Sequence, residues 1–236
     1  MLFEYPTEED WEKIARDFPF EKLNVRIGDF KKRANSNDLE EFFGNIELQT
    51  WTMHLQSRLF DVFRSFVLLM YYYQKGIPDA EWFISPGKRG QSVEYFPHFE
   101  TRHYLIKDQF DFYVDIFYYK VFAAWDTLGH ILNVLFEMGI EKPSFKSAIN
   151  HLERRDHYLW SRLRLILSDP EFERANKIRN SITHNFQPNL QSSGVARPEK
   201  NTYTFGVGDY TTSKMITDNV LKSLELFEKT LEIIRA

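Results

Sequence analysis

Two long stretches of the chain carry apolar residues three and four positions apart, the spacing of one face of an α-helix. The first stretch spans residues 38–75, and Gly76 is a typical residue to end such a helix. The second runs over about residues 102–138 and is stopped by Gly139. Inside the first stretch, Gly44 is a weak point at which the helix can break. The pattern therefore predicts two long helices.

Shorter helices are predicted from the same spacing and from helix-start residues. Thr7 precedes an acidic first turn, and Asp169 is followed by Pro170. The expected ranges are about 7–18, 147–154, 157–167, 171–185 and 213–234. Residues 23–27 and 202–207 alternate apolar and polar positions, which indicates short strands. We expect an all-α helical bundle of four to five main helices, with short extra helices and small β segments in loops.

The domain organisation follows from where these helices lie. The chain has 236 residues with 43% hydrophobic content, enough for one large core. We expect a single domain overall, in which residues 1–37 form an N-terminal helix and loop packed on a bundle made by residues 38–236. Two long loops, at residues 77–100 and 189–212, depart from a minimal bundle, and their role is open.

Several classes of protein are excluded by composition. The chain has no cysteine, so disulfides, thiolate metal sites and cysteine nucleophiles are excluded. The Glu-x-x-His spacing of di-iron bundles occurs only at Glu100 and His103, at a loop edge, so no metal or other cofactor is expected. The acidic start lacks the order of a signal peptide, and the apolar run at residues 66–73 is far below the about 20 residues that cross a bilayer. The sequence predicts a soluble, cytoplasmic protein with no membrane association.

Positive charge gathers in one part of the chain. The net charge is −4, but residues 145–187 contain eight lysines and arginines against five acidic residues, which makes this stretch +3 and leaves −7 for the rest. A modest basic region of this kind suits an anionic partner such as RNA or a nucleotide.

The basic region contains the segment Arg-Asn-Ser-Ile-Thr-His, from Arg179 to His184. On a helix these two residues are about 7–8 Å apart along the axis and about 140° apart around it. One straight helix therefore cannot aim both side chains at one atom. Either the helix loosens near His184, which Pro188 favours, or a second copy of the chain completes the site.

These residue types suit RNA cleavage without a metal. The reaction needs a base for the 2′-OH proton and an acid for the leaving 5′-oxygen, and imidazole can serve as either near neutral pH. The charge that develops on phosphorus needs a permanently charged, forked donor, which is arginine. His184 supplies one proton-transfer group per chain, so two chains would supply both.

An all-α bundle with Arg-polar-x-x-x-His on a late helix resembles the HEPN superfamily, whose motif is an arginine, four to six residues, and a histidine. Arg179, Asn180 and His184 match the preferred form, in which asparagine follows arginine. The resemblance covers residues 38–234. It implies a metal-independent endoribonuclease that attacks through the 2′-OH as a homodimer, with two motifs facing across the interface.

The resemblance also leaves the biological role open. Such a nuclease can be a toxin or defence protein with an antitoxin-like partner protein. Other members of the superfamily keep the fold and only bind nucleotides, RNA or proteins, so a non-catalytic binding module is the alternative.

Further residues complete the predicted site. Thr183 lies within the motif and is expected to support it, and Arg174 and Lys177 are expected to hold flanking phosphates. On the second long helix, Asp126 and His130 belong to a polar stripe that is either an exposed face or a wall of the cleft, with Asp126 orienting the motif arginine. Two structural roles compete with catalysis: the arginine can pair with an acid, and the histidine can cap the last carbonyls of its helix.

Overall fold

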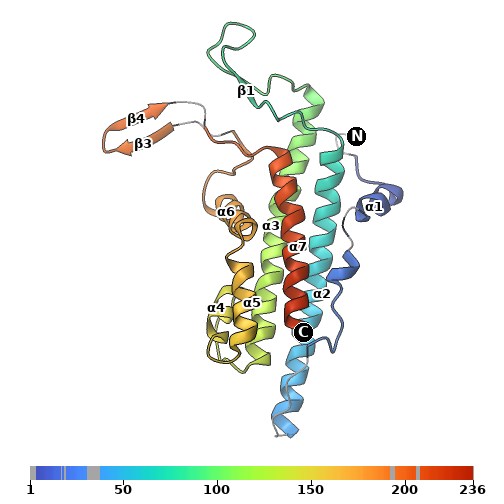
Figure 1. Cartoon of the computed structure of the whole chain (residues 1–236). Helices are drawn as coiled ribbons and strands as arrows, with labels where there is room; N and C mark the ends of the chain where they lie inside the picture. The colour runs from blue at the N-terminus through green and yellow to red at the C-terminus, as the bar shows by residue number, and fades with distance from the viewer. Residues whose placement is uncertain are drawn as a thin grey trace.

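The structure of the chain is a computed structural model, which describes residues 4–16, 18, 20–30, 38–191, 195–205 and 208–235. These residues form seven α-helices, one short 3-10 helix and two small antiparallel sheets of two strands each (Figure 1). The helices are α1 (Glu8–Ala15), η1 (Phe20–Leu23), α2 (Asp38–Gln74), α3 (Thr101–Leu135), α4 (Phe145–Leu152), α5 (His157–Leu167), α6 (Pro170–His184) and α7 (Ser213–Arg235). The strands are β1 (Phe83–Ile84), β2 (Glu94–Tyr95), β3 (Val195–Glu199) and β4 (Thr202–Phe205). The prediction of a mostly helical bundle with small β segments is confirmed.

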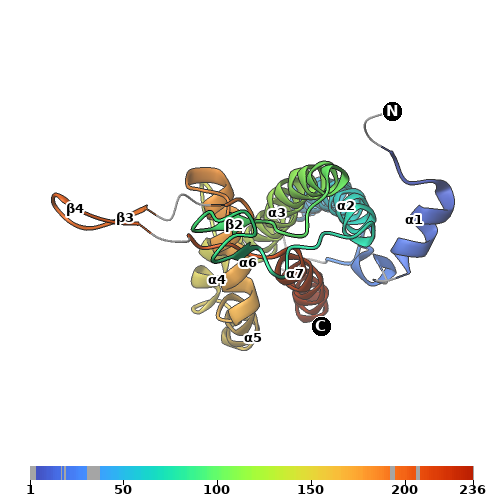
Figure 2. The ribbon, with the colours of Figure 1, turned by 90° about the horizontal axis from the view of Figure 1, so that it is seen from above.

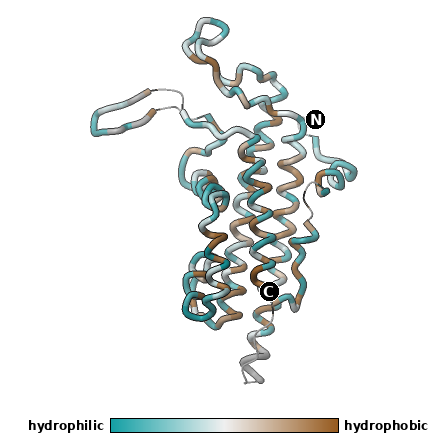
Figure 3. Tube along the Cα trace, in the orientation of Figure 1, coloured by the Kyte–Doolittle hydropathy of each residue, from teal (hydrophilic) through white to brown (hydrophobic). Residues whose placement is uncertain are grey.

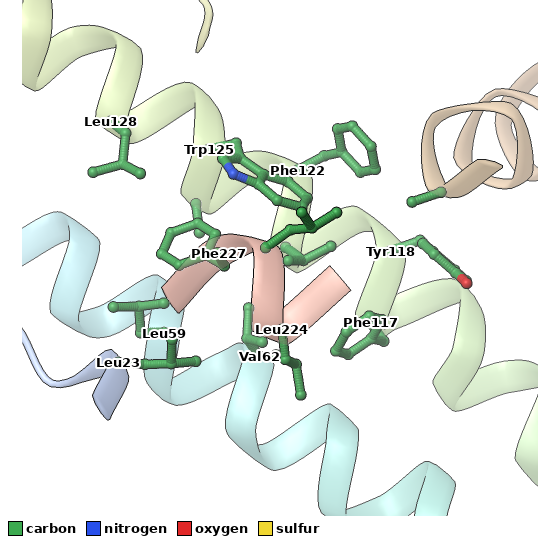
Figure 4. Packing of buried hydrophobic residues seen from close by; sticks show 14 of the residues in the cluster. Leu23, Leu59, Val62, Phe117, Tyr118, Phe122, Trp125, Leu128, Leu224 and Phe227 are labelled. Atoms are coloured by element: carbon green, nitrogen blue, oxygen red, sulfur yellow. The ribbon is translucent and has the colours of Figure 1, made fainter. Parts of the chain in front are cut away.

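Three long helices make the centre of the bundle. Helices α2 and α3 run side by side in opposite directions, and α7 packs along both of them (Figures 1 and 2). Hydrophobic positions recur along all three helices (Figure 3). They meet in a core in which Trp125 of α3 lies against Phe227 of α7, with their ring centroids 5.4 Å apart (Figure 4). The helical spacing of apolar residues therefore identified most of the core positions, whereas Ile46 and Met215, which fit the same spacing, are 45% and 46% exposed.

Some boundaries differ from the prediction. Helix α2 continues through Gly44 without a break. The strand expected at residues 23–27 is wrong: η1 ends at Leu23, and the next residues are irregular. Leu23 and Val25 are buried in the core and the residues between and after them are exposed, which gives the alternating pattern without a strand. The Val25 carbonyl accepts a hydrogen bond of 2.7 Å from the Gln56 side chain rather than from a neighbouring strand. None of the described helices is long and apolar enough to span a bilayer.

The start of α4 lies directly against α3. A Cβ on Gly129 of α3 would come within 2.6 Å of the Phe145 backbone nitrogen and of the Ser144 carbonyl oxygen. The Phe145 N–H donates a 3.2 Å hydrogen bond to Asp126, one turn earlier on α3. Glycine is therefore needed at position 129 because backbone, rather than a flexible side chain, occupies the space.

We predict that Gly129→Ala lowers the free energy of unfolding by about 1–3 kcal/mol, as other overpacked core sites do. Helix propensity alone would stabilise the alanine variant by about 1 kcal/mol, so the sign of the change reports the clash. Urea denaturation followed by circular dichroism measures it. A variant as stable as the parent would show that α4 can move away from α3 at little cost.

Candidate functional site

Helix α6 is fixed at its beginning by a side-chain cap and by hydrogen bonds from α7. The Asp169 side chain accepts from the Glu171 N–H at 2.9 Å and caps the helix, with Pro170 in its first turn. The fully buried Asn219 of α7 donates to both the backbone carbonyl and the carboxylate of Glu171, at 3.0 and 2.8 Å. Asn219 in turn accepts from the Tyr118 hydroxyl at 2.7 Å. These bonds position α6 across the bundle rather than along it (Figure 1).

Arg179 lies on the side of α6 that faces α3. Its guanidinium is 5.8 Å from the centroid of the Phe122 ring, and Nη1 donates a 2.9 Å hydrogen bond to the Asn180 side chain. The buried Nε has no hydrogen-bond partner, and no carboxylate in the described part of the chain forms an ion pair with Arg179. The positive charge of this half-buried arginine is therefore not neutralised, and Asn180 fixes its orientation.

His184 lies on the opposite side of the same helix. It is the last residue of α6 and is exposed. The helix stays regular up to this point, because the Thr183 hydroxyl donates to the Arg179 carbonyl at 2.8 Å and the Asn185 N–H donates to the Ser181 carbonyl at 2.9 Å. Among the described residues, His184 has no hydrogen-bond partner. The loosening of α6 before His184, offered above as one way to bring the pair together, does not occur.

The two structural roles considered for the motif are not seen. Within the described residues, Arg179 has no acidic partner and His184 donates to no carbonyl of α6, while the Ser181 carbonyl accepts from the Asn185 N–H. Within the described residues, neither Arg179 nor His184 has the stabilising partner that the two structural roles require.

Arg174 and Lys177 share a helix face with His184 rather than with Arg179. Their spacing of three and seven residues places the three side chains in one row along α6, and all three are exposed. Arg174 forms a 3.5 Å ion pair with Glu171, one turn earlier. The cations expected to hold flanking phosphates therefore line the solvent side of the motif.

Asp126 and His130 do not join the motif. Asp126 accepts from the Phe145 N–H, and His130 stacks on Trp51 of α2 with ring centroids 3.9 Å apart. Burial lowers the pKa of His130, as expected for an imidazole packed on an indole. Asp126 makes no hydrogen bond or ion pair with Arg179. The expectation that Asp126 orients the arginine needs correction: the polar stripe joins α3 to α4 and α2.

A comparison with known proteins identifies the family of the chain. A family model described as Cthe2314-like HEPN matches residues 51–236, which include α6 and its motif. The chain belongs to this HEPN family. Searches of curated proteins and of solved structures find no match. The resemblance inferred from Arg179, Asn180 and His184 is therefore confirmed at the level of the family.

A buried ion pair holds the segment that follows the HEPN motif. Lys107 and Asp111, one turn apart on α3, are both buried, and Lys107 Nζ lies 2.5 Å from Asp111 Oδ2. Lys107 also donates to the Asn189 carbonyl at 2.6 Å, and the Asn189 side chain donates to Asp111 at 2.7 Å. Sequence reasoning missed this clamp. Its signal in the sequence is a lysine and an aspartate four residues apart on the second long helix, the spacing of an ion pair on one helix face.

The far end of the same segment is held as well. The Lys107 ammonium lies 5.4 Å from the Tyr210 ring, and the Tyr210 hydroxyl donates to Asp79 at 2.6 Å. Asp79 also accepts from the backbone and side chain of Ser213, at 2.7 and 2.8 Å, where α7 begins. The two ends of the connection between α6 and α7 are thus held at one place on the bundle, by groups from α3 and from the segment after α2.

Asp115 continues the polar row one turn beyond Asp111. It accepts a hydrogen bond from Gln187, three residues after His184, while its second carboxylate oxygen is buried without a partner. Burial, and then the negative charge of Asp111, raise the pKa of Asp115 to about 6. Asp115, with a pKa near 6, therefore contacts the segment that directly follows α6.

Three exposed aromatic rings lie on the two segments that the Gln187–Asp115 hydrogen bond joins. Phe186 is 82% exposed, and Phe112 and Tyr119, seven residues apart on the outer face of α3, are 56% and 46% exposed. Gln187, which follows Phe186, donates a hydrogen bond to Asp115 of α3. In the sequence, Asp115 lies between Phe112 and Tyr119. Exposed aromatic side chains are enriched at protein interfaces.

We predict that Asp115→Asn stabilises the protein near neutral pH. The Asp115 carboxyl group holds its proton more tightly in the folded protein than in the unfolded chain, where its pKa is near 3.8. The contribution of Asp115 to the free energy of unfolding therefore falls as the pH rises from about 4 to about 6. Asparagine keeps an acceptor for Gln187 and removes the charge. Urea midpoints of variant and parent should differ at pH 7.5 and converge near pH 4.

The matched control is Asp108→Asn, an exposed carboxylate on the same helix. It should leave the midpoint nearly unchanged at both pH values. If Asp115→Asn were less stable than the parent at pH 7.5, the raised pKa of Asp115 would not describe the protein.

Proposed function

We propose that the protein is a metal-independent endoribonuclease that acts as a homodimer. The observation that carries the proposal is the state of the HEPN motif: Arg179 is held by Asn180 and has no acidic partner among the described residues, and His184 is exposed on the same regular helix. Membership in the HEPN family supports RNA as the ligand. The arginine provides a fixed positive charge for a phosphodiester, and the imidazole provides a proton-transfer group at neutral pH.

The chemistry divides between the two residue types. One imidazole accepts the proton of the 2′-OH as its oxygen attacks phosphorus, and a second imidazole gives a proton to the departing 5′-oxygen. The guanidinium stabilises the negative charge that grows on the non-bridging oxygens. The products are a 2′,3′-cyclic phosphate and a 5′-hydroxyl. This reaction requires the 2′-OH, so DNA is not a substrate.

The divergence of Arg179 and His184 favours a site shared between two chains. Since α6 stays straight, one copy cannot direct both side chains at one phosphate, and one copy supplies only one imidazole. A two-fold dimer would bring two motifs together across the exposed rings of Phe112, Tyr119 and Phe186. A toxin or defence role with an antitoxin-like partner remains a proposal that depends on this activity.

One observation favours a second candidate function. Among the described residues, no carboxylate or carbonyl binds His184 to fix its tautomer, as many catalytic histidines require. A HEPN module that binds a nucleotide, RNA or protein partner without turnover would need only the charge of Arg179. It would show saturable, salt-sensitive binding and no cleavage.

The first prediction from this proposal concerns cleavage. Incubation of the protein with RNA and EDTA should yield fragments that end in 2′,3′-cyclic phosphate, while DNA stays intact. Arg179→Ala and His184→Ala should each lower the rate by about 10²–10⁴-fold, as loss of one electrostatic or proton-transfer group does. Cleavage is followed on denaturing gels, and folding by circular dichroism.

His54→Ala is the matched control, since His54 is an exposed histidine on α2 away from α6. It should cleave like the parent. Binding of RNA without cleavage by the parent protein would support the non-catalytic alternative, and cleavage that survives both motif substitutions would remove the assignment.

A second prediction concerns assembly. Sedimentation at micromolar concentration should show a dimer, and Phe112→Asp together with Tyr119→Asp should give monomers that no longer cleave RNA, because charges in an apolar interface are left without partners. Tyr203→Asp, at a ring on β4 that is 56% exposed, is the control and should keep the dimer. A fully active monomer would rule out a shared site.

A further inference from the structure

A pocket of about 290 Å³ lies between α2 and α3. Positions three, four and seven residues apart on a helix share one face, and both helices contribute such a row to the lining. The rows consist of Asp61, Arg64 and Leu68 on α2 and of Tyr113, Ile116 and Lys120 on α3. The volume is close to the lower limit of the range of about 300–1,000 Å³ for small-molecule sites, so the pocket suits a small ligand.

The pocket faces away from the HEPN motif. Tyr113 lies nine positions before Phe122, whose ring centroid is 5.8 Å from the Arg179 guanidinium. At about 100° per residue, the Tyr113 and Phe122 side chains leave α3 in opposite directions. The residues proposed above for cleavage and for the dimer interface do not line the pocket. A ligand bound here would therefore occupy a second, separate site.

One end of the pocket is charged. The Asp61 carboxylate accepts from Arg64 Nη2 at 3.2 Å through one oxygen and from Lys120 Nζ at 2.7 Å through the other. No other carboxylate within the described residues pairs with these two cations, so two positive charges against one negative charge leave a net charge of +1. The guanidinium and the ammonium each keep further N–H groups for an acceptor.

The other end of the pocket is apolar and aromatic. Leu68 and Tyr113 are buried, and each lies seven residues from the charged end, which is about 10 Å along a helix. Tyr5 joins them there through a side-chain hydrogen bond with Tyr113. Burial raises the pKa of Tyr113 to about 12, so its hydroxyl stays uncharged near neutral pH and does not repel an anion.

The segment that carries Tyr5 is fixed to the bundle. The Glu4 carbonyl accepts from the Tyr72 hydroxyl at 2.9 Å, and the Glu4 carboxylate pairs with Lys75 at 2.7 Å. Tyr5 itself is 69% exposed, so these contacts of its neighbour, together with Tyr113, set its position rather than burial of its own ring. The aromatic end of the pocket is thus formed by the protein alone.

The two ends together select the class of ligand. A single negative charge balances the net charge of +1, whereas a phosphate monoester carries about −1.5 to −2 and exceeds it. A cationic ligand would be repelled by Arg64 and Lys120, because both oxygens of Asp61 are already occupied. A neutral ligand forms no charge-assisted hydrogen bond with either cation. The observations therefore favour a monoanion with an apolar body.

We propose that this pocket binds a small organic acid, with its carboxylate between Arg64 and Lys120 and an aromatic body against Tyr5 and Tyr113. The proposal goes beyond the nuclease function and does not depend on it. Asp61 holds the two cations side by side, so that one carboxylate can accept hydrogen bonds from both. Binding is non-covalent, and the ligand is released unchanged.

Isothermal titration calorimetry near neutral pH, with indole-3-propionate as the probe, tests this site. Indole-3-propionamide has the same shape without the charge and should bind at least about tenfold more weakly. Arg64→Gln and Lys120→Gln should each weaken binding of the acid about tenfold and leave binding of the amide nearly unchanged, because each removes a charge-assisted hydrogen bond. Tyr5→Ala should weaken both by the same factor, because it removes a ring and no charge.

The matched controls are Arg102→Gln and Lys214→Gln, which remove one arginine and one lysine from exposed ion pairs elsewhere. They should change the affinity for the acid by less than twofold. The side chains of Arg64 and Lys120 are 57% and 40% exposed, so their substitution is expected to preserve the fold, which circular dichroism checks. The comparison of acid with amide uses the parent protein alone and holds even if a variant unfolds.

Three results would overturn the organic-acid site. The first is equal affinity of the parent for acid and amide, or no saturable binding of the acid at millimolar concentration. The second is unchanged affinity of both folded variants, Arg64→Gln and Lys120→Gln. The third is tighter binding of AMP or of single-stranded RNA that these two substitutions weaken, which would assign the pocket to a phosphate ligand instead.

Discussion

The burial of α3 is the constraint on which the rest of the structure depends. This helix is apolar around most of its circumference, and α2 and α7 cover one part of it while α4 and α6 cover another. Trp125 shows the result, because its ring contacts Phe227 of α7 at 5.4 Å and Phe172 of α6 at 4.8 Å. Helix α6, which carries the HEPN motif, is thus part of the shell that α3 needs in order to leave water.

The polar groups on α3 are placed where a second element must be held. Lys107 and Asp111 are buried, which is costly for charges unless they are paired and their remaining hydrogen bonds are satisfied. Asn189 satisfies both of them at once. The same row ends at Asp115, whose contact with Gln187 lies three residues from His184. Burial raises the pKa of Asp111, while Lys107 opposes that change, so the pair depends on close contact.

The motif itself departs from what stability alone would select. In the part of the chain that the structure describes, the Nε of the half-buried Arg179 has no hydrogen-bond partner and its charge is paired with no acid, which is unfavourable for folding. The π face of Phe122 and the side chain of Asn180 offset part of that cost and fix the direction of the group. An arginine prepared in this way is ready for an anion.

The sequence by itself determined the helical bundle, its core faces and the motif. Apolar spacing is a local property, so the ranges of α2, α3, α6 and α7 could be derived from it, and the six residues from Arg179 to His184 pointed to the HEPN family that the comparison confirms. The strand predicted at residues 23–27 failed because two buried residues in an irregular segment produce the same alternation as a strand.

Only the tertiary structure decided what the polar side chains contact. Asp126 was assigned to the motif because it lies on a polar stripe, yet the approach of α4 at Gly129 gives it the Phe145 N–H instead. The clamp between Lys107, Asp111 and Asn189 joins residues 82 positions apart, which no local pattern can indicate. The helix period fixes the direction in which a side chain points away from the axis of its own helix. Its partner depends on how other helices pack, and packing is set by the whole core.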